Sequence, residues 1–208
     1  MNAANKILLT FSISFGLISA LTYAEPELAY VTNEKDDTIS VINLDSYEVV
    51  KTIAVGERPR GFIFNQDHSL AYICASDSDR IQILDITTDQ IIGELPSGDD
   101  PETIALHPND NIMYTANEDD ALLTVIDVPS KQVITQIDVG VEPEGLAVSN
   151  AGDIVVVTSE TTNMVHWIKT DTNQNYANSI VGARPRSVYF TKDDSKLWVS
   201  AEIGGTVH

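Results

Sequence analysis

Cysteine is almost absent from this sequence, since Cys74 is the single one among 208 residues. One cysteine cannot form a disulfide within the chain, so a disulfide framework is excluded and packing must stabilise the fold. A Cys-x-x-Cys-His haem attachment is excluded as well. Cys74 shares a repeated position with Thr32, Ala116 and Thr158, which predicts a small buried side chain rather than a nucleophile.

Basic residues are also scarce. The chain has 12 Lys and Arg against 31 Asp and Glu, a formal net charge of -19. Binding to nucleic acid depends on clustered cations that neutralise phosphates, so this composition argues against it. The negative charge favours solubility and is compatible with a basic or cationic partner.

Common catalytic motifs are missing too. The sequence has no Gly-rich phosphate loop and no Gly-x-Ser-x-Gly elbow. Of the four histidines, His68 and His107 are expected in turns, while His166 and His208 share a strand position, and no two have metal-ligand spacing. We therefore predict no catalytic residue, no metal ligand and no cofactor held by the chain itself.

The N-terminus carries a separate signal. Lys6 precedes an apolar run over residues 7–21, and Thr22, Tyr23 and Ala24 follow it. This is the pattern of a secretory signal, and the run is too short to favour a membrane span. We expect residues 1–24 to be a signal peptide and the mature protein, from Glu25, to be periplasmic; a retained N-terminal anchor is the alternative.

What the sequence has in quantity is repetition. A 42-residue unit recurs without insertion or deletion at residues 28–69, 70–111, 112–153 and 154–195, and an incomplete fifth copy covers 196–208. Glycine recurs at Gly56, Gly98, Gly140 and Gly182, and proline three residues later at Pro59, Pro101, Pro143 and Pro185. A strict period of this size is typical of solenoids, propellers and arrays.

Each copy contains four short runs rich in β-branched and aromatic residues. In the first copy they are residues 29–32, 38–44, 49–55 and 61–64. Because polar turns separate them and no helical period competes, we expect a four-stranded antiparallel sheet in each copy. The run after the proline is apolar without alternation and should be the buried inner strand. The run before the glycine includes Pro96 in one copy, so it should be an outer edge.

Four-stranded sheets repeated at this interval predict an all-β fold, a β-propeller built of blades. The chain resembles the YVTN family of β-propellers from residue 28 to the end, at Tyr30-Val31-Thr32-Asn33, Val41-Ile42-Asn43, Val55-Gly56 and Pro59. The resemblance implies about four blades of a total of seven, so that the sequence would be the N-terminal part of a longer product. A four-unit arc completed by a partner or a dimer is the alternative.

Loops of an antiparallel sheet alternate between two faces, so the loops after the first strands and the proline loops should share one face. We call this the axial face. Its charged residues are Arg58, Arg60, Glu102, Glu144, Arg184, Arg186, Glu34, Glu118, Glu160 and Glu202. The arginines offer planar forks for an anion, and the acidic loops offer oxygens for a cation or a basic partner. We predict that this face binds a protein partner or a small anionic ligand; salt bridges between loops at a wet rim are the alternative.

One strand position is aromatic in several copies, at Tyr30, Tyr72, Tyr114 and Trp198. We expect these rings to pack between adjacent blades rather than to form a stacking platform.

Exported YVTN-type proteins resemble, in particular, the β-propeller proteins associated with PQQ-dependent catabolism. The resemblance implies a non-enzymatic binding or accessory protein, with PQQ held by a partner quinoprotein alcohol dehydrogenase, because this chain lacks the repeated tryptophan docking motif of those enzymes. A propeller enzyme of lactonase or haem-type oxidoreductase kind is one alternative, and a nucleic-acid-binding exported propeller is another. A lactonase would need acid, base or metal ligands converging at the axial mouth.

Overall fold

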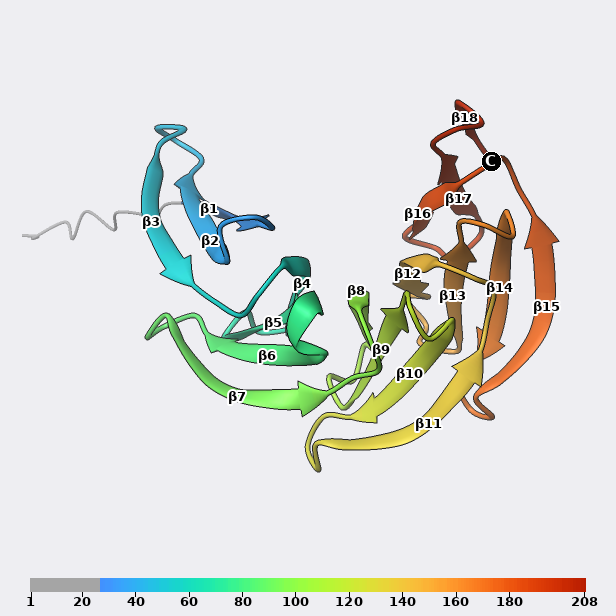
Figure 1. Ribbon diagram of the computed structural model, residues 1–208, viewed down its shortest axis with the longest axis horizontal. Coiled ribbons are helices and arrows are strands. Elements are labelled where there is room, and N and C mark those ends of the chain that lie inside the picture. Colours follow the sequence, from blue (N-terminus) through green and yellow to red (C-terminus); the bar gives the residue numbers. More distant parts are fainter. Residues whose placement is uncertain (1–26) are drawn as a thin grey trace, which may run out of the picture.

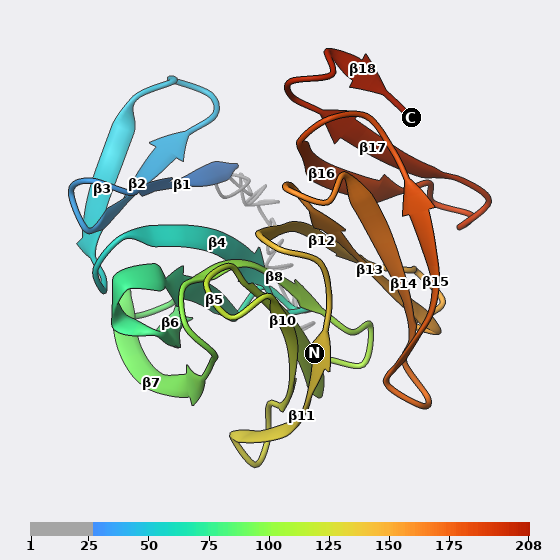
Figure 2. The ribbon, with the colours of Figure 1, turned by 45° about the vertical axis from the view of Figure 1, so that its right-hand side comes forward.

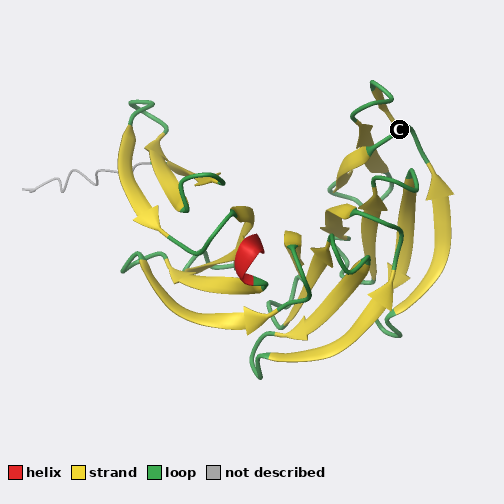
Figure 3. Ribbon diagram, in the orientation of Figure 1, coloured by secondary structure: helices red, strands yellow, loops and turns green. Residues whose placement is uncertain are grey.

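The computed structural model describes residues 27–208, and the expected signal peptide lies outside these residues. The described part contains strands β1 to β18 and a short 3-10 helix, η1 (Ser76–Ser78). The strands form five antiparallel sheets that follow one another around a common axis in an arc (Figure 1). Figure 3 shows how completely strands dominate this arc. No helix in the described residues is long and apolar enough to cross a membrane.

Three sheets have four strands, and the first and last have three. The first sheet is β1 (Leu28–Asn33), β2 (Thr38–Asn43) and β3 (Val49–Ala54). The second is β4 (Pro59–Phe64), β5 (Leu70–Ala75), β6 (Arg80–Asp85) and β7 (Gln90–Pro96). The third is β8 (Pro101–Leu106), β9 (Ile112–Asn117), β10 (Leu122–Asp127) and β11 (Gln132–Asp138). The fourth is β12 (Pro143–Val148), β13 (Ile154–Ser159), β14 (Met164–Lys169) and β15 (Gln174–Ile180), and the fifth is β16 (Pro185–Phe190), β17 (Leu197–Ala201) and β18 (Thr206–Val207).

The sheets are out of phase with the sequence repeat, which corrects the expectation that the four runs of one copy form one sheet. The run after the proline pairs forward: β4 pairs with β5 of the next copy and not with β3. A sheet therefore consists of the last strand of one copy and the first three strands of the next. The described part accordingly holds five sheets rather than about four.

The predicted order of strands within a sheet is confirmed. The runs after the prolines, β4, β8, β12 and β16, lie at the inner ends of their sheets and contact one another around the axis (Figure 2). The runs before the glycines, β3, β7, β11 and β15, lie at the outer edges. Every residue of β15 is exposed, in keeping with its polar sequence.

Neighbouring sheets pack face to face, and the hydrophobic core lies between them. Tyr72 and Cys74 of the second sheet pack against Ile104 and Met113 of the third. The aromatic position behaves as expected there, because Tyr72 is 3% and Tyr114 1% exposed. Trp198 is 49% exposed, since it lies on the fifth sheet, which no further sheet covers in the described part.

The glycine before each proline is required by a close approach. A Cβ placed on Gly56 would lie 2.7 Å from the Cβ of Ala75, and one on Gly182 would lie 2.7 Å from the Cβ of Ala201. The connection between two sheets therefore runs directly over the end of the next sheet's second strand. This contact fixes where the charged residues that follow the glycine can lie.

Candidate ligand-binding face

The charged residues of the axial face lie at the ends of short, tightly held connections. The residue before each proline has a left-handed backbone although it is not glycine, with φ of 52° at Arg58, 49° at Asp100 and 57° at Arg184. Side chains of the neighbouring loops hold this conformation. The Arg58 N–H donates to Asp37 Oδ1 (2.9 Å) and the Arg184 N–H to Asn163 Oδ1 (3.0 Å). The same conformation occurs in turns of the opposite face, at Tyr47, His68 and Lys131, so it belongs to the tight turns of the repeat and does not by itself mark a site.

The structure brings the predicted residues together in one ion-pair network that reaches from the first sheet to the fifth. All ten lie on the axial face, and all but Glu118 take part in an ion pair. Two acidic residues outside the predicted set, Asp77 and Asp100, also join it through Arg58.

One half of the network surrounds Arg58 and Arg60. Arg58 binds Asp100 (2.8 Å) and Glu102 (3.1 Å). Arg60 contacts Glu102 and binds Glu34 (3.1 Å) and Glu144 (3.3 Å). Both guanidinium groups are therefore occupied by carboxylates of the protein itself.

The other half surrounds Arg184 and Arg186. Arg186 binds Glu144 (2.7 Å) and Glu160 (2.5 Å), while Arg184 binds Glu160 (2.6 Å) and Glu202 (3.3 Å). Glu144 joins the halves because it pairs with both Arg60 and Arg186.

Three carboxylates of the network are buried: Glu102 is 1%, Glu144 8% and Glu160 5% exposed. Burial and the neighbouring Glu144 raise the pKa of Glu102 to about 8, although Arg60 acts in the opposite direction. Burial also raises the pKa of Glu144, against the lowering effects of Arg186 and Arg60. At the exposed rim, the hydrogen bond from Arg58 lowers the pKa of Glu34. The axis is therefore a place where negative charge is costly to hold.

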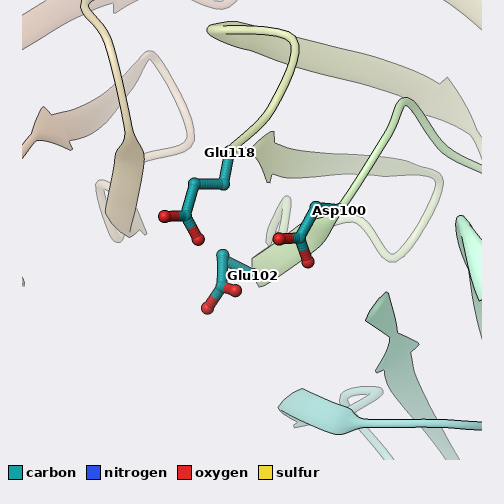
Figure 4. A group of neighbouring side chains, drawn as sticks. All are labelled: Asp100, Glu102 and Glu118. Atoms are coloured by element: carbon teal, nitrogen blue, oxygen red, sulfur yellow. The ribbon is translucent and has the colours of Figure 1, made fainter. Parts of the chain in front are cut away.

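Glu118 lies next to Asp100 and the buried carboxylate of Glu102. Figure 4 shows its side chain beside those of Asp100 and Glu102, and one carboxylate oxygen of each residue lies within 4.8 Å of the others. Among the described residues this group comes nearest to a cation site. Arg58 already binds Asp100 and Glu102, so a guanidinium supplies part of the positive charge that a metal would bring.

The repeat shows what is unusual about Glu118. Its equivalents Glu34, Glu160 and Glu202 each bind an arginine of an adjacent connection. The connections beside Glu118 carry Asp100 and Glu142 at the corresponding position, so no guanidinium reaches it from them. Among the described residues Glu118 therefore forms no ion pair, and its neighbours Asp100 and Glu102 are acidic.

A cavity of about 380 Å³ opens beside this cluster. Its lining includes Thr32, Glu34, Arg60, Glu102, Thr103 and Arg186. It is large enough to admit an amino-acid side chain, and it exposes both signs of charge at its wall.

Sequence reasoning located this face but missed part of how it works. The repeated columns gave the ten charged positions, whereas Asp77 lies just outside the repeated charged columns. His166, which was expected in a strand and without a ligand role, binds the backbone of a connection that leads to the axial face.

Comparisons with known proteins bear on the fold. No family model matches the chain, and no curated protein matches it. Among solved structures, hydrazine synthase of Kuenenia stuttgartiensis superposes with a TM-score of 0.77 at 22% sequence identity, over 83% of this chain and 51% of that one. The fold is an all-β propeller. The chain spans about half the length of that structure, and the similarity concerns the propeller fold alone.

Proposed function

We propose that this protein is a non-enzymatic propeller of YVTN type that binds a partner through its axial face. The observation that carries the proposal is the surplus of carboxylates at the axis. Four arginines share their ion pairs with seven carboxylates, and Glu118 adds an eighth beside them. A partner that presents a basic side chain would offset this charge.

A basic protein partner fits better than a small anionic ligand. Each of the four guanidinium groups already binds at least two carboxylates. An anion would have to displace these carboxylates and leave buried Glu144 or Glu160 without a counter-ion, which is costly. A cationic group would instead meet Glu118 without breaking an existing pair.

The proposed setting is periplasmic quinoprotein alcohol catabolism. The N-terminal export pattern and the resemblance to propellers associated with PQQ-dependent catabolism support it. In this proposal PQQ belongs to the partner enzyme, and this chain supplies a docking face.

The surface test uses a hexa-arginine peptide as probe and the full mature protein. We expect Glu118→Gln to weaken binding about tenfold or more, since a charge-assisted contact contributes roughly 1.5–3 kcal/mol. Glu48→Gln is the matched control, because Glu48 is exposed in the β2–β3 loop on the opposite face. Equal affinities of the two variants, or no binding by the wild type at low salt, would contradict the proposal. Recovery of a quinoprotein alcohol dehydrogenase on the wild type, but not on Glu118→Gln, would support the proposed setting.

An enzyme of lactonase kind is the second candidate. It is favoured by the place of Glu102 in the wall of the axial cavity, where burial raises the pKa of its carboxyl group, because a carboxyl group that keeps its proton can act as a general acid. Hydrolysis of a lactone panel that Glu102→Gln abolishes would favour this candidate over a docking protein.

A haem-type oxidoreductase would show haem in the purified full-length protein. The nucleic-acid alternative predicts salt-sensitive retention on DNA.

A further inference from the structure

His166 binds the backbone of a connection that leads to the axial face. Its ring, on β14, is 5% exposed. Nε2 accepts the N–H of Gly140 (3.0 Å) and lies 2.9 Å from Ser159 Oγ, while Nδ1 lies 2.7 Å from Asn178 Oδ1. Gly140 belongs to the connection between β11 and β12.

The contact with Gly140 indicates a neutral ring. A backbone N–H can only donate, so Nε2 must carry a lone pair toward Gly140. The proton is then on Nδ1, where it donates to the amide oxygen of Asn178. A protonated ring would turn an N–H toward the N–H of Gly140, and that hydrogen bond would be lost.

The surroundings of the ring are neutral. It contacts Ser159 on β13, Asn178 and Asn175 on β15, and Gly140 on the connection. No carboxylate or basic side chain among the described residues contributes to its pKa, which burial lowers and the bond to Asn178 partly restores. No nearby counter-charge therefore stabilises the protonated ring.

The β11–β12 connection is packed closely against the neighbouring strand at Gly140. A Cβ on Gly140 would lie 2.6 Å from the Cβ of Ser159, so the backbone lies directly against β13. Two residues beyond Gly140 comes Glu142, and two further comes Glu144, which joins the halves of the ion-pair network. Release of Gly140 would therefore loosen the backbone that leads to the central carboxylate of the axial face.

The repeat supplies an internal control. At the equivalent position of the second sheet, Gln82 Oε1 accepts the N–H of Gly56 at 2.7 Å. In the fifth sheet His208 accepts the N–H of Gly182 at 3.0 Å, but that ring is exposed. Glutamine makes the same bond but does not titrate. The hydrogen bond itself therefore serves the fold, and a buried histidine at this position makes that bond depend on pH.

We propose that His166 is a proton-operated latch that holds the β11–β12 connection when neutral and releases it on protonation, thereby lowering the affinity of the axial face for a basic partner. The link to affinity rests on the proposed function, whereas the latch itself does not. Acid also protonates carboxylates of the axial face, so a variant is needed to separate the two effects.

The test compares wild type with His166→Gln at about pH 7.5 and about pH 5. Backbone hydrogen exchange over residues 138–144, corrected with an unstructured peptide of the same sequence, should rise about tenfold or more in the wild type at the lower pH and rise much less in the variant. His68→Gln, in a turn on the opposite face, should respond like the wild type. Equal responses of wild type and His166→Gln would overturn the latch.

A second measurement needs no variant. In the wild type, NMR should show the Gly140 amide shift changing with the same pH midpoint as the His166 ring, and different midpoints would overturn the proposal. Hexa-arginine affinity, measured in parallel, should fall more on acidification in wild type than in His166→Gln. Absence of peptide binding at both pH values would refute the proposed function while the exchange data still decide the latch.

Discussion

At the scale of single residues, the axial face is organised around carboxylates that have left water. Glu102, Glu144 and Glu160 are buried, and burying a charge is unfavourable unless a partner offsets it. Arg60 and Arg186 supply that offset to Glu144, and both bind its Oε1. The arginines therefore stabilise the fold, whatever the face binds.

Replacement of Arg186 should test this structural role. Arg186→Gln leaves Glu144 and Glu160 each with one ion pair fewer, so we expect the free energy of unfolding to fall by about 1–3 kcal/mol. Urea denaturation measures the change. Arg80→Gln is the control, because the Arg80–Glu94 pair is exposed and should contribute less than about 1 kcal/mol. Equal losses in the two variants would show that the axial pairs are no stronger than surface pairs.

Glu102 makes stability depend on pH in a defined direction. Its pKa rises from 4.5 to about 8 in the folded protein, so the folded state binds the proton more tightly. The contribution of this group to stability is therefore lost as the pH rises from about 4.5 to about 8. Glu102→Gln should make the decline of unfolding free energy over this window shallower, as measured by urea denaturation at several pH values. An unchanged slope would assign the decline to other groups; Glu94→Gln, on an outer strand, is the matched control.

At the scale of the elements, the faces between sheets contain most of the packing. Tyr72 is 3% exposed between the second and third sheets, whereas Trp198 is 49% exposed on the fifth. Tyr72→Ala should lower the free energy of unfolding by about 3–5 kcal/mol, and Trp198→Ala by about half of that or less. Chemical denaturation of the two variants measures both losses. A loss below about 1 kcal/mol for Tyr72→Ala would argue for a surface role of this ring.

The strands and their order could be predicted from the sequence, but their pairing across the repeat could not. Pro96 and the apolar runs without alternation after the prolines located the outer and inner strands correctly. The turn at residues 65–69 and the connection at residues 55–58 have similar lengths, so chain length alone does not decide whether β4 pairs with β3 or β5. Packing around the axis decides it, and that information is not local.

At the scale of the whole molecule, the sequence located the charged face but not its internal pairing. Columns of the repeat placed Arg58, Glu102 and their equivalents on one side, because loops of antiparallel sheets alternate. Arginine and glutamate side chains have many rotamers, so spacing could not show that Glu144 bridges two arginines or that Glu118 has none. Those facts depend on the curvature that brings several sheets to one axis.

The offset between repeat and sheet has a mechanical consequence. Each repeat gives three strands to one sheet and its last strand to the next, so the backbone of every repeat links two neighbouring sheets covalently. The inner strand of a sheet belongs to the preceding repeat, and the last strand of the sheet's own repeat is the inner strand of the next sheet. A sheet therefore cannot separate from the arc without disrupting the sheets on both sides. Unfolding of one sheet should therefore destabilise its neighbours, so that the sheets unfold cooperatively and not as independent modules.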